Sequence, residues 1–249
     1  MLFADLKPLT QLSGIFAALG VFIALFYGII VLFKAIKLKE KRLFYFFFAI
    51  IFTMSPWYPS GLGYIYWLIT HKEIAYPAYV LLGTVGVPIA LYSWLQIYMP
   101  ALHLKYKNIA TVITICLSIA LYFYVFSLLF IVPDGPIEEL IGIKRNPIDI
   151  DYKGFVLIFL AFSVLVSTVT GNDFAISSLK NKEDRILIWK GRFLLLSFNL
   201  FAIGAIGDGF IELSAITLII FRTFMMLAST FYYIGFIMPK WMMKILKLK

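Results

Sequence analysis

Seven long apolar runs, separated by short clusters of polar and charged residues, set the pattern of this chain. The runs cover approximately residues 12–36, 43–60, 78–101, 109–132, 154–178, 188–207 and 213–238. A helix needs about 20 apolar residues to cross the hydrocarbon core of a bilayer. Because lipid offers the backbone no hydrogen bonds, each run must pair its own amides as a helix. The pattern predicts an all-α polytopic membrane protein, a seven-transmembrane-helix bundle that forms one domain over residues 1–249.

The second run is interrupted near its end. Pro56, Pro59 and Gly61 stand close together there, and such residues kink or end a helix. Residues 62–70 that follow are rich in Tyr and Trp, which suit the headgroup interface. Two alternatives follow: a short span with an interfacial or re-entrant piece after it, or one long kinked span over residues 43–69.

The third run carries a proline in its interior. Gly83 and Gly86 precede Pro88. A proline frees a backbone carbonyl, and small residues let a neighbouring helix approach closely. We predict a bend at this point, which either lines a pocket or serves packing alone.

The composition indicates that lipid is the solvent of this chain. It is 62% hydrophobic and only 14% charged, with a mean hydropathy of +0.94, so it has too little polar surface for a water-soluble globule. The net charge of +9 would suggest nucleic acid as the partner of a soluble protein. Here the basic residues fall between apolar runs, where they meet lipid headgroups. We expect a multi-pass protein of the cell membrane that contacts the lipid bilayer and binds no nucleic acid.

Basic residues are distributed unevenly between the two sides of the predicted bundle. The first, third and fifth connections and the C-terminal tail hold 16 Lys and Arg residues, and the opposite side, including the N-terminus, holds 5. Cytoplasmic loops carry the excess of Lys and Arg in membrane proteins. The distribution predicts an N-terminus outside the cell and a C-terminus in the cytoplasm.

Motifs for catalysis or metal binding are missing from the sequence. His71 and His103 fall on opposite sides of the predicted membrane, so they cannot share a metal or a haem. Cys116 is the single cysteine, and no nucleophile elbow, phosphate-binding glycine loop or paired acidic metal motif occurs. We predict a protein that is not an enzyme, with no catalytic residues, no metal and no cofactor.

Arg222 is the clearest candidate for a functional residue, because it lies within the seventh apolar run. Insertion of a charged side chain near the helix centre costs about 2.5–3.5 kcal/mol, so Arg222 is expected to face the bundle interior and a partner. Asp208 and Glu212 are the nearby acids, but Glu212 lies about 15 Å away along the same helix. We predict a ligand-binding site of Arg222, Asp208, Asn199 and Pro88. A structural ion pair is the alternative role for Arg222.

One stretch resembles a known family. Residues 232–241, Tyr-Tyr-Ile-Gly-Phe-Ile-Met-Pro-Lys-Trp, preceded by Arg222, are similar to the end of the seven-helix sensory region of prokaryotic histidine kinases. Residues 81–89 and 94–98 are similar in character. Nine residues follow Lys240, without a kinase domain, so the resemblance implies a sensory module that signals through a separate cytoplasmic partner.

Three functions follow from these patterns. The first is a receptor-like or sensory seven-helix protein that binds a small or lipidic ligand and couples to a cytoplasmic partner. The alternative is a non-catalytic accessory or scaffold subunit within a larger membrane complex. A transporter is the second alternative, and it would require broken helices near the middle of the membrane.

Overall fold

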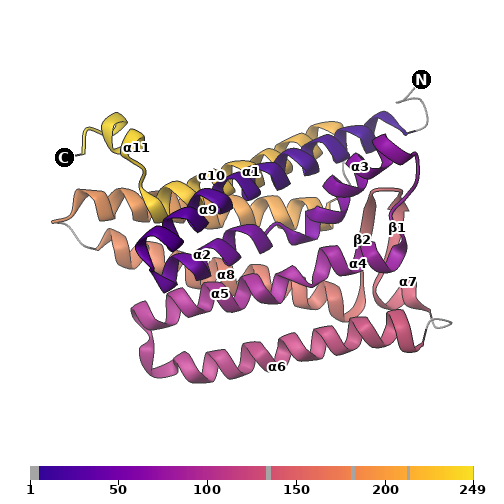
Figure 1. Ribbon diagram of the computed structural model, residues 1–249, viewed down its shortest axis with the longest axis horizontal. Helices are drawn as coiled ribbons and strands as arrows, with labels where there is room; N and C mark the ends of the chain where they lie inside the picture. Colours follow the sequence, from indigo (N-terminus) through magenta and orange to yellow (C-terminus); the bar gives the residue numbers. More distant parts are fainter. Residues whose placement is uncertain (1–5, 133–135, 181–182, 212–213, 249) are drawn as a thin grey trace.

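The computed structural model describes residues 6–132, 136–180, 183–211 and 214–248. Within them, six helices are long and apolar enough to cross a bilayer. These are α1 (Pro8–Leu38), α4–α5 (Tyr76–Thr84 and Gly86–Leu102), η2–α6–η3 (Leu104–Tyr106, Lys107–Phe126 and Ser127–Ile131), α8 (Gly154–Leu179), α9 (Arg185–Phe210) and α10 (Ala215–Ile237). They form one bundle of helices (Figure 1). The helical membrane fold is confirmed, and six of the seven predicted runs form helices that are long and apolar enough to cross a bilayer.

The second predicted run forms a broken helix. It consists of α2 (Lys41–Phe52), η1 (Ser55–Trp57) and α3 (Tyr58–Thr70), and neither helical piece alone has the length of a span. The two helical pieces pack antiparallel along α1: Gly28 of α1 faces Ile51 of α2, and Gly14 of α1 faces Tyr64 of α3. The helical structure continues to Thr70, so it covers the same residues as the alternative of one long kinked span over residues 43–69.

Helix α1 buries its small residues and exposes its large ones. Its buried positions recur every three or four residues and include Gly14, Ala17, Val21, Ala24, Gly28, Val31 and Ala35. Large side chains such as Phe22, Phe26 and Phe33 are exposed on the opposite face. Membrane helices associate through small residues because lipid is as apolar as a leucine side chain. Residue size, rather than polarity, therefore selects the face of α1 that packs.

The two broken helices meet at their breaks. The α4–α5 break falls at Val85, one turn before the predicted bend at Pro88, which sits in the first turn of α5, where no amide partner is needed. The Ser55 hydroxyl donates to the Gly83 carbonyl (3.2 Å), and the Tyr122 hydroxyl donates to the Val85 carbonyl (2.8 Å). Hydroxyl groups from neighbouring helices thus bond the carbonyls around the break.

A small β-hairpin closes one end of the bundle. After the short helix α7 (Ile137–Leu140), β1 (Gly142–Asn146) and β2 (Asp149–Tyr152) pair antiparallel. The Tyr76 and Tyr79 hydroxyls of α4 donate to the carbonyls of Gly142 and Ile148, at 2.7 and 2.9 Å. The all-α prediction did not include this hairpin. We call this the hairpin end of the bundle.

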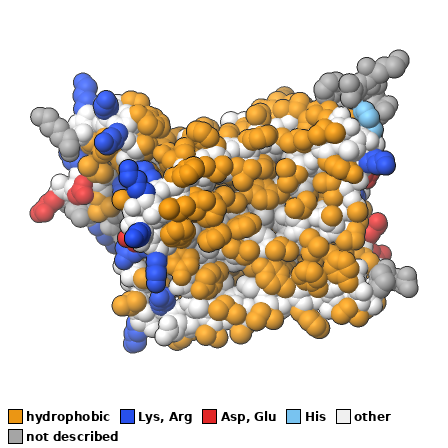
Figure 2. All heavy atoms as spheres, in the orientation of Figure 1, with side chains coloured by type: hydrophobic (Ala, Val, Ile, Leu, Met, Phe, Trp, Pro, Cys, Tyr) orange, Lys and Arg blue, Asp and Glu red, His pale blue; other side chains and the backbone are white. Residues whose placement is uncertain are grey.

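Lys and Arg side chains gather at the opposite end. That end carries the start of α2 and the terminal helix α11 (Lys240–Ile245). Figure 2 shows the basic side chains at its left edge and a broad apolar belt across the middle of the visible face. We call it the basic end. The charge asymmetry read from the sequence is thus an asymmetry of the folded bundle.

Replacing Gly61 by alanine tests the close approach of α3 to α1. The new Cβ would lie 2.9 Å from the backbone nitrogen of Ala18, so the two helices would have to separate. Overpacking of this kind costs about 1–3 kcal/mol. We expect a lower thermal unfolding midpoint in detergent. Gly20→Ala is the matched control, because its Cβ would meet only Met226, at 3.8 Å; equal midpoints for the two variants would contradict the packing.

Candidate functional site

A cavity of about 830 Å³ lies in the half of the bundle nearest the hairpin. Its walls come from α8 and α9, with η1, the first turns of α5 and the hairpin completing them. Leu157, Leu160 and Val164 line it from α8, and Phe201 and Ala205 line it from α9. This size lies within the range of about 300–1,000 Å³ that small-molecule sites occupy.

The positions of glycines explain why α8 and α9 leave space between them. Toward the basic end, a Cβ on Gly171 would lie 2.3 Å from the Phe198 ring, so α8 and α9 are in close contact there. Toward the hairpin end, Gly204 and Gly207 of α9 face α10 instead. A Cβ on Gly204 would lie 2.8 Å from the Phe221 carbonyl, and Gly207 abuts the Phe221 ring. Helix α9 therefore packs closely against α10 at this end, and the cavity lies between α9 and α8.

The cavity reaches the outer surface of the bundle between α8 and α9. Leu165 of α8 lines it and is 62% exposed, and Ile206 and Phe210 of α9 line it and are 51% and 61% exposed. Exposed apolar side chains on a membrane helix face acyl chains. This mouth therefore opens sideways, toward the hydrocarbon of the bilayer.

Charged side chains concentrate where the cavity meets the hairpin. Arg145, Asp149, Asp151 and Lys153 line it from β1, β2 and the residue that follows. Arg145 and Asp151 form an ion pair (3.0 Å). Burial raises the pKa of Asp149 to about 6, and the positive charges of Arg222 and Arg145 oppose this rise. The cavity thus has a charged end and apolar walls.

Arg222 and Asp208 form a buried ion pair behind this charged end. The Arg222 Nε donates to Asp208 Oδ1 at 3.0 Å, and the two side chains are 2% and 10% exposed. The Trp57 indole donates to the other carboxylate oxygen (2.7 Å), and Arg222 Nη1 donates to the Ser13 carbonyl. Asp208 lines the cavity, whereas Arg222 does not. Glu212, the other candidate acid, lies outside the described residues.

The remaining predicted site residues lie outside the cavity lining. Asn199 of α9 exchanges amide hydrogen bonds with Asn172 of α8, at 2.8 and 3.4 Å. Pro88 is buried, and its neighbour Val87 lines the cavity in its place. The structure brings together Asp208 and Arg222, but it does not bring Asn199 or Pro88 to the same surface.

Sequence reasoning missed the contribution of the hairpin. Asp149 and Lys153 fall in a polar connection that carried no helical signal. Alternating isoleucines at 148 and 150, beside charged neighbours, were the available sign of a strand. The position of that strand over the cavity is a tertiary property.

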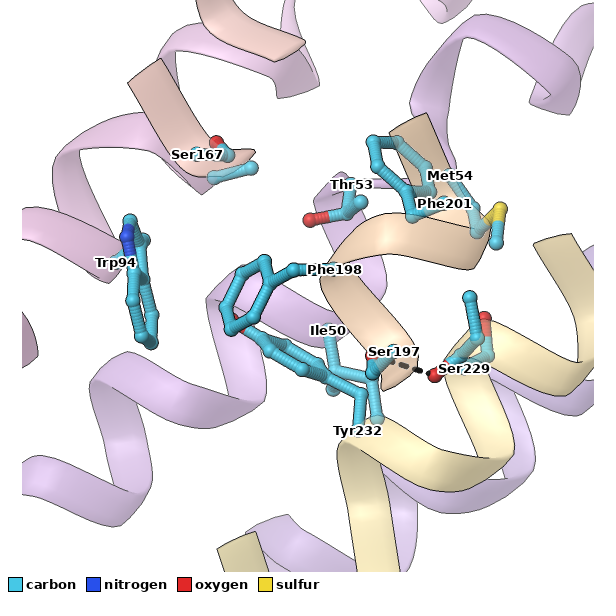
Figure 3. A pocket seen from close by; sticks show the side chains of 12 residues that line it. Ile50, Thr53, Met54, Trp94, Ser167, Ser197, Phe198, Phe201, Ser229 and Tyr232 are labelled. Carbon is cyan, nitrogen blue, oxygen red and sulfur yellow. Dashed lines mark hydrogen bonds between the residues drawn. The ribbon is translucent and has the colours of Figure 1, made fainter. Parts of the chain in front are cut away.

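A second, smaller cavity of about 40 Å³ lies next to the main one, toward the basic end, and shares Thr53, Ala90, Ser167 and Phe201 with its lining. Figure 3 shows Trp94, Phe198 and Tyr232 around it. The Trp94 ring lies 4.8 Å from the Phe198 ring and 6.1 Å from the Tyr232 ring, centroid to centroid. Further ring contacts lead from Tyr232 to Phe236, near the last turn of α10 (5.9 Å). Aromatic side chains thus connect the cavity with the basic end.

No family model matches this chain, and no significant similarity was found to curated proteins or to solved structures. The resemblance to a histidine kinase sensory region stays a prediction.

The Arg222→Met variant tests the ion pair. It would leave the Asp208 carboxylate buried beside Trp57 without its cation, and removing one partner of a buried pair costs about 3–5 kcal/mol. We expect unfolding in detergent to show a loss of this size, and the double variant Arg222→Met/Asp208→Asn to recover most of it. A double variant no more stable than Arg222→Met would show that charge pairing is not the stabilising interaction.

Proposed function

We propose that this chain is a receptor-like seven-helix membrane protein whose outer cavity binds a small or lipidic amphiphile and whose basic end passes the response to a cytoplasmic partner. One observation carries the proposal: an 830 Å³ cavity with charged groups at one end, apolar walls and a mouth between α8 and α9. A head group would occupy the charged end, and an acyl chain would lie along the walls. The resemblance to a sensory region agrees with this function.

The aromatic residues between the cavity and the basic end supply a route for the response. A ligand that reaches the smaller cavity would touch Trp94, Phe198 or Tyr232. Side-chain packing in protein interiors is tight, so a new occupant there displaces rings rather than compressing them. Displacement of Tyr232 would be passed to Phe236 and, through Met238 and Pro239, to α11.

The proposed topology has seven spans, with the hairpin end outside and the basic end in the cytoplasm. The broken helix α2–η1–α3, second in chain order, is the span that brings the total to seven. Its pieces pack along α1 from Gly28 to Gly14. The excess of Lys and Arg at the basic end supports its cytoplasmic placement.

The accessory-subunit function is supported by a different observation. Arg222 is bonded to Asp208 and to the Ser13 carbonyl within the bundle, as expected for a chain that needs no ligand. The transporter alternative is supported by the two broken helices that meet at Ser55 and Gly83. Ligand binding with a response at the basic end separates the receptor-like function from the accessory function.

Filling the mouth of the cavity tests the proposed function. Gly209 of α9 lines the cavity, and a Cβ there would have nothing within 4 Å, so Gly209→Trp is expected to fold and to block the mouth. We expect amphiphiles such as lysophospholipids to raise the unfolding midpoint of the unsubstituted protein and not that of Gly209→Trp. Ile119→Trp, on the exposed face of α6, is the control. Unchanged stabilisation in Gly209→Trp would overturn the cavity as the binding site.

Cysteine labelling tests the topology. In a Cys116→Ser background, single cysteines are placed at Lys41 and Lys72, which flank α2–η1–α3, and at Lys244 on α11. A membrane-impermeant maleimide should label Lys72→Cys in intact cells and label the other two only after permeabilisation. Equal labelling of Lys41→Cys and Lys72→Cys in intact cells would show that α2–η1–α3 does not cross.

A further inference from the structure

Among the described residues, Asp149 is a carboxylate at the charged end of the cavity that makes no ion pair within 4.0 Å. Asp151 is paired with Arg145, and Asp208 with Arg222, both at 3.0 Å. Asp149 accepts a hydrogen bond from the backbone N–H of Ile150 (3.1 Å). This carboxylate is therefore the acidic group with free capacity for a cation.

The groups around Asp149 do not neutralise it. Arg222 of α10 and Arg145 of β1 act on it through space but are bonded to other carboxylates, and Asp208 of α9 repels it. Tyr79 of α4 donates its hydroxyl to the Ile148 carbonyl instead. Asp149 is half-buried at the cavity surface, and a ligand cation would pair a carboxylate that has no cation bonded to it.

The walls below Asp149 suit a hydrocarbon chain. The hydroxyls of Ser163 and Thr168 donate to carbonyls one turn back in α8, at 2.8 and 2.7 Å, so the wall offers few free polar groups. The mouth at Leu165 and Ile206 leads from this wall to the lipid-facing surface. A molecule that dissolves in the bilayer can enter by this mouth without crossing water.

We propose that the cavity takes an amphiphile with an ammonium head group, which enters sideways between α8 and α9 and pairs its ammonium with Asp149. This inference rests on the proposed function, because it assigns a ligand class to the same cavity. Two sources share this chemistry, a membrane lipid with an ethanolamine head and a free long-chain amine. A phosphate in the lipid head would meet Lys153, which lines the same end.

Head-group selectivity tests the inference. The purified protein in a neutral detergent is titrated with four probes at equal mole fraction, and binding is followed by the unfolding midpoint. Lysophosphatidylethanolamine and dodecylamine carry the ammonium, whereas lysophosphatidylglycerol and dodecanol are matched probes without it. We expect at least one ammonium probe to bind about tenfold more tightly than its match, since hydrogen bonds to charged groups are the strong ones. The ammonium probe that shows this preference identifies the source.

Asp149→Asn should remove that preference and leave the binding of dodecanol unchanged. Glu73→Gln is the matched control, because Glu73 is an acid of the hairpin end that is paired with Lys144 at 3.2 Å and does not line the cavity. An undiminished ammonium preference in Asp149→Asn, or a preference of the unsubstituted protein for lysophosphatidylglycerol, would overturn the inference. Failure of Gly209→Trp to block any probe would instead overturn the proposed function.

The pH dependence gives a second measurement on the unsubstituted protein. The pKa of Asp149 is raised to about 6, so its charge is present above that pH and is lost as the pH falls through it. The ammonium of dodecylamine stays charged throughout. We expect its binding to weaken between pH 7.5 and 5 while dodecanol binding stays constant. Dodecylamine binding that is flat over this range would contradict the role of Asp149.

Discussion

The buried ion pair between Arg222 and Asp208 is the constraint on which the hairpin half of the bundle depends. A guanidinium in a membrane helix must find acceptors inside the protein, because lipid supplies none. Here it draws together four segments: α10 carries Arg222, α9 carries Asp208, α1 supplies the Ser13 carbonyl, and η1 supplies the Trp57 indole to the same carboxylate. The break between α2 and α3 thereby has a structural role, because it positions Trp57 against the carboxylate.

The cavity exists because small residues direct α9 toward α10. Gly204 and Gly207 let α9 approach Phe221 of α10 at the hairpin end, while Gly171 joins α8 and α9 only toward the basic end. Since close helix approach in membranes depends on residues without bulky side chains, the choice of which glycine faces which helix sets where space remains. The ion pair and the glycines act together, because both hold α9 against α10 and away from α8.

The same arrangement separates the structural charge from the charge that is free to bind. Asp208 lines the cavity but is already bonded to Arg222 and Trp57, so it contributes shape and polarity. Asp149 reaches the cavity from the hairpin and keeps an unpaired carboxylate. In the proposed function, the unpaired carboxylate at the charged end and the apolar walls together would select amphiphiles by head group. The ring contacts from Trp94 through Tyr232 to Phe236 lead from the smaller cavity toward the end of the bundle where the basic residues lie.

The sequence alone determined the helical membrane fold, six of the helices that can span, the charge asymmetry and the need of Arg222 for an internal partner. These features follow from hydropathy and charge within single segments, and local composition is enough to establish them. Tertiary structure decided the rest. Helix continues past Pro59 because α3 packs on α1 through Gly61, and Asn199 pairs with Asn172 rather than joining the cavity. Asp149 lines the cavity only because the hairpin folds over the bundle, a contact between segments distant in the chain that no local pattern encodes.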